Sequence, residues 1–310
     1  MLVVLRDVFH QLFHPGGSGH LSDMLARSVW RMFQRLNTRY SAPLGLAAPT
    51  ALVVVITSWT ALLAVGWALV YWPYMPESFL YSTGLSPSAN AGFIDAFYLS
   101  LMTMTTLGYG DITPTAGMLR VLNPVQSLIG FGLLTASVTW VLSIYPALSR
   151  RRTLAQEISL LHIAESKGAK DISEMDAQTV EQLFRDLASR LAGVRNDLRQ
   201  FGITYYFHGS DEHSALAAGL PYVAHLAKRG RRDGHPEEVR LSSDMLAAAL
   251  DDFADALAPR FLALDHPATT KVLEAYARDH RRETLSHGDL SGRNGRQEPP
   301  GPSPNGGSGA

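Results

Sequence analysis

The apolar residues of this chain gather in two long stretches that carry no charged side chain. One stretch lies between Arg39 and Glu77, and the other lies between Arg120 and Arg150. A bilayer core of about 30 Å needs roughly 20 apolar helical residues, and both stretches are longer than that. A core helix of a soluble protein is the alternative, but such a helix rarely runs this far without a charge. The pattern therefore predicts two membrane-spanning helices, over about residues 47–72 and 118–145.

A shorter apolar pattern lies between the two spans. It follows a loop rich in proline, serine and glycine, and it places Phe93, Phe97, Leu101 and Met104 at helical spacing. A helix over about residues 92–105 is too short to cross a bilayer. Because the helices on both sides of it must meet the same membrane face, we predict a re-entrant helix that enters the membrane and returns.

Arginine is distributed unevenly around the spans. It recurs through residues 1–46 and again at 150–152, whereas Arg120, at the outer end of the second span, is the sole arginine from residue 40 to residue 149. Segments on the cytoplasmic side carry an excess of Lys and Arg, so we expect a multi-pass protein of the cell (plasma) membrane with both termini in the cytoplasm. Residues 1–14 and 21–36 show amphipathic patterns, which predict helices lying on the inner membrane surface.

The re-entrant helix leads directly into the sequence TMTTLGYGDITPT at residues 103–115. Irregular backbone at membrane depth is tolerated only inside protein or along a watery path. Gly108 and Gly110 can adopt backbone angles closed to other residues, so the carbonyls from Thr106 to Tyr109 can be turned toward a common axis. Rings of such oxygens replace the water around a dehydrated potassium ion, and the negative end of the preceding helix dipole favours a cation there.

The motif TTLGYGD, placed between a re-entrant helix and a second span, resembles the selectivity filter of potassium channels. The topology is similar to the two-transmembrane, one-pore-loop family of prokaryotic type, and the resemblance covers roughly residues 47–149. It implies passive potassium conduction through a homotetramer in the lipid bilayer. The ion-binding residues that it implies are Thr106, Leu107, Gly108, Tyr109 and Gly110. The filter-supporting residues are Thr105, Asp111 and Tyr98.

The resemblance also assigns roles to particular residues near the filter. It predicts a hydrogen bond between Tyr98 and Asp111, with tyrosine in place of the more usual tryptophan. Leu107 stands where valine or isoleucine is commoner, and Met102 stands where some members have a glutamate. Gly130 lies where family members have a glycine that lets the inner helix bend. Close helix packing by a small residue is an equally weighted alternative for Gly130.

The C-terminal half has the polar, charged character of a cytoplasmic helical domain, predicted over residues 150–282. Apolar residues from Val180 to Phe201 recur in steps of three and four, which favours a helical bundle over a coiled-coil seam. Further helices are predicted at 212–229, 241–264 and 268–282. His208 and His213 frame a segment for which a solvated loop is favoured over a metal site. The tail at 283–310 is too rich in proline, glycine and serine to fold.

Composition narrows the function further. The net charge of −1 gives no case for nucleic-acid binding, and the chain has no cysteine and no recognisable catalytic motif. We therefore expect an all-α membrane channel that is not an enzyme, needs no cofactor and binds no metal except K⁺ in its filter. Nothing in the sequence identifies a ligand of the cytoplasmic domain. The alternatives are a nonselective cation channel and a non-conducting, membrane-anchored helical sensor or scaffold. The predicted parts are residues 1–46 (interfacial), 47–149 (pore, with filter 106–111), 150–282 (cytoplasmic) and 283–310 (tail).

Overall fold

The computed structural model describes residues 2–13, 20–40, 46–167, 175–207, 215–232, 234–265 and 267–280. The described regular structure is helical except for two strands of three residues each, so the fold is all-α, as the sequence predicts. Two compact units are present. The first comprises Met1–Thr153 and Ala192–Asp211, and the second comprises Leu154–Leu191 and Glu212–Ala310.

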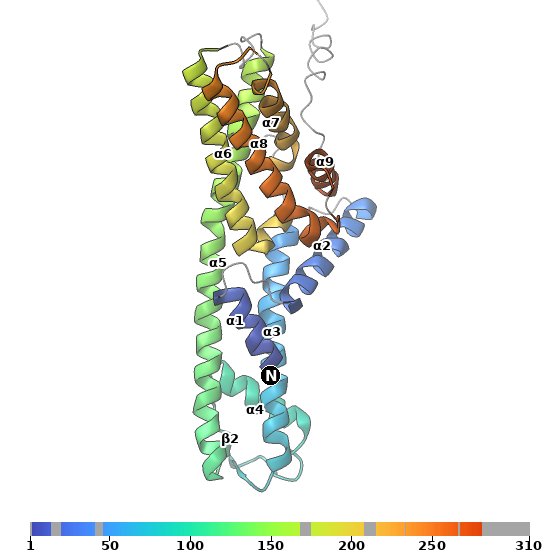
Figure 1. The fold of residues 1–310 in the computed structure, drawn as a ribbon. Helices are drawn as coiled ribbons and strands as arrows, with labels where there is room; N and C mark the ends of the chain where they lie inside the picture. Colours follow the sequence, from blue (N-terminus) through green and yellow to red (C-terminus); the bar gives the residue numbers. More distant parts are fainter. Residues whose placement is uncertain are drawn as a thin grey trace, which may run out of the picture. The chain divides into compact units, whose positions relative to one another are not determined.

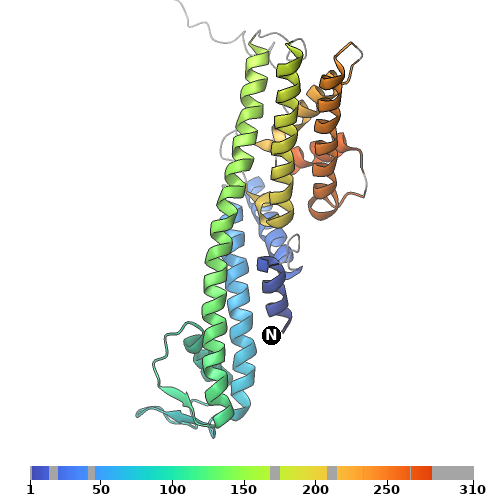
Figure 2. The same cartoon turned by 60° about the vertical axis from the view of Figure 1, so that its left-hand side comes forward.

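The first unit is built on the two helices that are long and apolar enough to cross a bilayer. These are α3 (Ala47–Tyr71), which continues as the short turn η2 (Trp72–Tyr74), and α5 (Gly117–Ser166), whose first part belongs to this unit. They run in opposite directions, as Figures 1 and 2 show. The helix α5 is continuous through two internal prolines, Pro124 and Pro146.

The segment between the spans contains the short elements that the filter depends on. The helix α4 (Phe93–Met104) packs against α3, and the filter sequence follows it. The strands β1 (Phe79–Tyr81) and β2 (Ile112–Pro114) pair antiparallel on either side of α4 in the chain, with Leu80 opposite Thr113. The sequence did not predict these strands, because three residues are too few to display an alternating pattern.

The N-terminal helices pack on the first span. They are α1 (Leu2–Phe13) and α2 (His20–Tyr40), and both contact α3. The buried carboxylate of Asp7 in α1 accepts hydrogen bonds from Ser22 Oγ at 2.7 Å and from Trp59 Nε1 at 3.0 Å. A buried carboxylate needs such donors. The amphipathic pattern of residues 1–14 predicted a helix on the membrane surface. It did not indicate that α1 would contact the middle of α3.

The second unit is a helical bundle, the arrangement that the sequence favours. Its elements are the end of α5, most of α6 (Ala177–Gln200), α7 (Leu216–Gly230), α8 (Glu237–Leu257), the π-helical turn η6 (Ala258–Leu262) and α9 (Thr269–Asp279). The ring of Phe184 in α6 is fully buried and lies against Gly230 of α7. At this position the apolar face of α6 is therefore covered by α7 of the same chain.

A buried ion pair joins two helices of this bundle. Glu165 at the end of α5 pairs with Arg229 of α7 at 2.5 Å, and both side chains are at least nine-tenths buried. Tyr222 also donates its hydroxyl to Glu165, at 2.6 Å. Several proposed features lie outside the described residues, namely His208, His213 and the tail at 283–310.

Candidate functional site

The helix α4 sets the position of the filter. Its first turn is capped by Asp95, whose Oδ2 accepts a hydrogen bond from the backbone N–H of Gly92 at 3.0 Å. It ends at Met104, and its 12 residues rise only about 18 Å, which is too short to cross a bilayer. This short apolar helix between two spans has the length that the sequence predicts for a re-entrant helix.

The backbone after α4 changes the sign of φ from one residue to the next. Thr106, Gly108 and Gly110 have φ values of 59°, 50° and 75°, whereas Leu107 and Tyr109 between them do not have positive φ. Such alternation gathers neighbouring N–H groups on one side of the chain, which leaves the carbonyl oxygens for the other side. Two of the three left-handed positions are glycine, which takes this conformation without steric cost.

The N–H groups on the inner side of this segment are already engaged. Leu107 and Gly108 both donate to the carbonyl of Met102, at 3.0 and 3.3 Å, and Thr106 donates to the carbonyl of Thr103 at 3.1 Å. Within the described residues, the carbonyls of 106–109 accept no backbone or side-chain hydrogen bond. These oxygens are therefore available to a cation, in the pattern that a selectivity filter requires.

Side chains behind the filter hold its outer end. The hydroxyl of Tyr98 donates to Asp111 Oδ2 at 2.7 Å, which is the hydrogen bond expected from the resemblance, and Ile112 N–H donates to Asp111 Oδ1 at 3.1 Å. The carbonyl of Asp111 accepts from Ser82 N–H at 2.8 Å, beside the β1–β2 pair. Asp111 is thus tied both to α4 and to the outer loop.

Immediately before the predicted filter, Thr105 turns its hydroxyl back to the helix α4. Thr105 Oγ1 donates to the carbonyl of Leu101 at 2.8 Å. This bond supports the predicted structural role of Thr105, because the hydroxyl stabilises the last turn of α4 and is engaged there. Thr106 starts the run of unpaired carbonyls that follows.

Gly130 in α5 lies against the end of α4. A Cβ atom built on Gly130 would come within 2.2 Å of the carbonyl oxygen of Met104, whereas one built on Gly132 would meet nothing within 4 Å. Real Cβ atoms do not approach backbone this closely, so a glycine is needed where α5 crosses the filter helix. The geometry favours the packing interpretation of Gly130; the bending interpretation stays a prediction.

The sequence did not identify the polar residues that join the helices around the filter. Gln126 in α5 and Ser100 in α4 have no exposed surface and are hydrogen-bonded to one another. The signal that could have found Gln126 is a side-chain amide inside an uncharged span, since polar residues in spans usually face the protein interior and carry a role. Its partners lie far away in the sequence, so only the fold identifies them.

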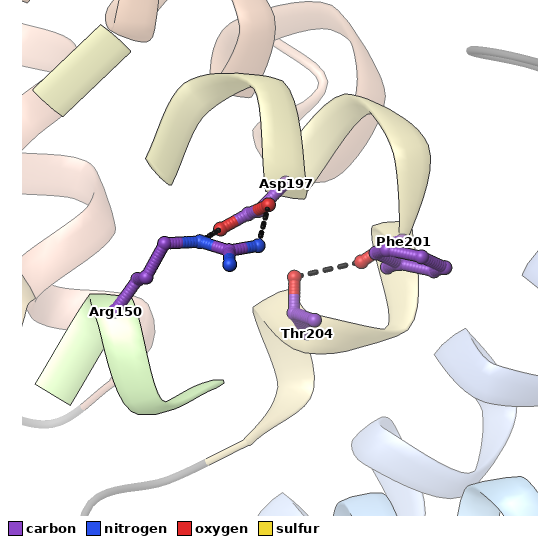
Figure 3. Close-up of polar contacts among 4 residues, drawn as sticks. All are labelled: Arg150, Asp197, Phe201 and Thr204. Atoms are coloured by element: carbon purple, nitrogen blue, oxygen red, sulfur yellow. Dashed lines mark hydrogen bonds and ion pairs between the residues drawn. The ribbon is translucent and has the colours of Figure 1, made fainter. Parts of the chain in front are cut away.

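A second polar cluster lies where α5 leaves the apolar stretch. Arg150 makes a two-pronged ion pair with Asp197 at the end of α6, with nitrogen–oxygen distances of 2.6 and 2.8 Å (Figure 3). The short helix η4 (Gly202–Tyr206) follows, and within it Thr204 Oγ1 donates to the carbonyl of Phe201 at 2.7 Å. Arg151 donates to the carbonyls of Thr204 and Phe207.

These contacts explain a difference from the predicted domain boundary. The sequence places the start of the cytoplasmic domain at residue 150, whereas the structure groups Ala192–Asp211 with the membrane helices. Because Arg150 and Arg151 bind the end of α6 and η4, these later residues belong to the first unit. Because the contacting residues lie about fifty positions apart in the chain, no local sequence pattern predicts this contact.

Comparisons with known proteins agree with this geometry. Residues 51–145 match a protein-family model described as an ion channel. A Bacillus subtilis protein named "Uncharacterized membrane protein YdjJ" is 24% identical over 258 residues, which cover 83% of this chain and 74% of that protein. Two-pore potassium channel 2 of Arabidopsis thaliana is 42% identical over 55 residues, covering 16% of this chain and 12% of that protein.

A further relative is the hyperpolarization-activated voltage-gated potassium channel of Methanocaldococcus jannaschii. It is 45% identical over 56 residues, which cover 17% of this chain and 26% of that protein. No solved structure gives a significant match. Residues 51–145 contain the two spans' apolar parts, α4 and the filter, so they form an ion-channel domain. Over this region the chain matches the ion-channel family, and together with the two helices long and apolar enough to cross a bilayer this match supports a membrane channel.

Proposed function

We propose that the protein is a potassium-selective channel that conducts K⁺ passively down its electrochemical gradient. The observation that carries this proposal is the alternating backbone of residues 106–110. The N–H groups of Thr106, Leu107 and Gly108 are engaged, whereas the carbonyls of 106–109 accept no hydrogen bond within the described part of the chain. Carbonyl oxygens without a proton donor suit a dehydrated monovalent cation. The sequence TTLGYGD adds the resemblance to potassium filters, and the curated potassium channels match over a short region of the chain.

The proposed channel is a homotetramer, with four copies around one conduction axis. One chain supplies a single filter segment, whereas a ring of oxygens needs several copies. The side chains of Leu107 and Tyr109 are 56% and 72% exposed in the single chain. Such exposure of large side chains beside a membrane-embedded loop fits contact with a neighbouring copy. Four is the number that the family resemblance implies.

The proposed orientation places both chain termini in the cytoplasm. It rests on the arginines of residues 1–46 and on Arg150, Arg151 and Arg152 after the apolar part of α5. From residue 40 to residue 149 the sole arginine is Arg120, at the outer end of α5. Labelling of single introduced cysteines from either side of the membrane tests this placement, because the natural chain has none.

The test of conduction is cation flux into liposomes that contain the purified full-length protein. We expect potassium-driven flux that exceeds sodium-driven flux and that is lost in Gly108→Ala. A residue with a Cβ costs about 1–2 kcal/mol in the left-handed conformation that Gly108 occupies. Since nothing lies within 4 Å of that added Cβ, a loss of flux would reflect the backbone conformation rather than a clash.

Calorimetric titration of K⁺ and Na⁺ into the detergent-solubilised protein makes the test independent of whether the pore is open. Preferential K⁺ binding that Gly108→Ala removes supports the proposal. Equal binding and flux of the two ions would instead indicate a nonselective cation channel. A folded oligomer that neither binds K⁺ nor conducts would indicate a membrane-anchored scaffold.

A further inference from the structure

A hydrogen-bonded network lies inside the apolar part of the first unit. At its centre is the side-chain amide of Gln126 in α5. Its Nε2 donates to both the backbone carbonyl and the hydroxyl of Ser100 in α4, at 2.9 and 2.8 Å, and its Oε1 accepts the hydroxyl of Tyr71 in α3 at 2.6 Å. All three residues have no exposed surface. One side chain therefore joins both spans to the filter helix.

Neighbouring contacts extend this network. The hydroxyl of Ser100 donates a hydrogen bond to the carbonyl of Ala64 in α3, at 2.8 Å, and the hydroxyl of Thr103 in α4 donates to Asn123 Oδ1 in α5, also at 2.8 Å. Both protons of the Gln126 amide, its oxygen and the hydroxyl of Ser100 are thus satisfied. In the bilayer core no water is present to replace a lost partner, so a complete network of this kind holds its helices in one arrangement.

The network includes a hydrogen bond to the backbone of α4, the helix that precedes the predicted filter. Gln126 bonds to the carbonyl of Ser100, and the N–H groups of Leu107 and Gly108 bond to the carbonyl of Met102 on the same helix. A shift of α4 would therefore move the filter backbone with it. Tyr98 and Ser100 are two positions apart, or roughly 200° around a helix, so Asp111 and Gln126 hold α4 from different faces.

We infer that Gln126 is a positioning residue of the filter, acting through Ser100 and the backbone of α4 to keep the carbonyls of residues 106–109 spaced for K⁺ rather than Na⁺. This inference rests on the proposed potassium selectivity. It concerns a residue outside the proposed ion-binding segment 106–110. It also differs from the Tyr98–Asp111 hydrogen bond, which holds the outer end of the filter.

Two substitutions test the inference at different strengths. Ser100→Ala removes a hydroxyl that accepts from Gln126 and donates to the carbonyl of Ala64, and Gln126→Leu removes the whole amide at similar volume. Ser137→Ala is the matched control, because Ser137 is buried in the same helix α5 and its hydroxyl has no hydrogen-bond partner within the described residues.

The measurement is the ratio of K⁺ to Na⁺ affinity, obtained by calorimetric titration of the full-length oligomer and checked by liposome flux. We expect Ser100→Ala and Gln126→Leu to lower this ratio about threefold to tenfold, the range that corresponds to one or two membrane-embedded hydrogen bonds. Ser137→Ala should leave the ratio unchanged. A residue that only stabilises the fold would lower the melting temperature equally in K⁺ and Na⁺ and leave the ratio as it was.

The outcomes separate this inference from the proposed function. If the natural protein shows no preference for K⁺, the proposed selectivity fails. If it prefers K⁺ and the assembled Gln126→Leu variant keeps the full ratio, the positioning role of Gln126 is wrong. Where Gln126→Leu does not assemble, the assembled Ser100→Ala variant tests the contact through the Ser100 hydroxyl, and a full ratio in that variant overturns this part of the inference.

Discussion

At the scale of single residues, the hydroxyl of Tyr98 holds the filter through Asp111. Tyr98→Phe keeps the ring and removes the 2.7 Å hydrogen bond. Among the described residues, the N–H of Ile112 is then the remaining hydrogen-bond donor to the Asp111 carboxylate. A hydrogen bond to a charged group contributes about 1.5–3 kcal/mol, so we expect the outer filter to loosen and the potassium current to decay faster under constant driving force. Planar-bilayer recording measures the decay rate.

Tyr81→Phe is a suitable control for that experiment. Tyr81 lies in the neighbouring strand β1, and its buried hydroxyl has no hydrogen-bond partner within the described residues. Loss of that hydroxyl should not change the decay. An unchanged decay in Tyr98→Phe as well would show that the Tyr98–Asp111 bond does not govern filter stability.

Gly130 gives a second prediction at this scale. A methyl group at Gly130 would overlap the backbone of Met104, whereas one at Gly132 would meet open space. Overpacking of this kind costs about 1–3 kcal/mol, so Gly130→Ala should lower the thermal stability of the oligomer while Gly132→Ala should not. Equal stability of the two variants would argue against the packing role and favour the alternative, in which Gly130 lets the helix α5 bend.

The residues of the site differ in how far the sequence alone could reveal them. The left-handed backbone at Gly108 and Gly110 was predictable because its information is local, with two glycines, a tyrosine and the preceding helix all adjacent in the chain. The ion-binding role of these residues stays a prediction. The Tyr98–Asp111 bond followed from the family resemblance. The role of Gln126 was not predictable, because its partners Ser100 and Tyr71 come from two other helices and the pattern of an apolar span does not say which face each residue occupies.

At the scale of elements, α5 carries a row of hydroxyl side chains on an otherwise apolar surface. Thr135, Thr139 and Ser143 recur every four residues, and each donates to the carbonyl four positions earlier, at 3.0, 3.0 and 2.8 Å. The sequence predicted this helix, and its extent within the membrane stays a prediction. It could not assign faces, because apolar residues surround the helix on all sides and give no amphipathic period.

The hydroxyl row predicts which face of α5 lines the conduction path. Thr139 and Val138 are adjacent and both exposed in the single chain, but in a membrane the hydroxyl row should face water. The chain contains no cysteine, so Thr139→Cys and Val138→Cys each introduce a single thiol. We expect a cationic thiol reagent to modify the first faster and to reduce potassium flux. Faster modification of Val138→Cys would assign the opposite face.

At the scale of the whole molecule, the two compact units differ in what can stabilise them. The proposed K⁺ sites lie in the first unit, whereas the second is a helical bundle containing the buried Glu165–Arg229 pair. The sequence predicted a helical cytoplasmic region but not that residues 192–211 group with the membrane helices. That contact depends on Arg150 and Asp197, which no local pattern connects.

This division predicts a selective effect of potassium on thermal unfolding. A ligand that binds only the folded first unit stabilises it by about 2.7 kcal/mol at one hundred times its Kd, so replacing Na⁺ by K⁺ should raise the unfolding temperature of that unit. The second unit should unfold at the same temperature in both salts, which tryptophan fluorescence and calorimetry can separate, since all five tryptophans lie between residues 30 and 140. Gly108→Ala should abolish the shift. An equal shift in that variant would mean that K⁺ acts on the protein at a place other than the filter.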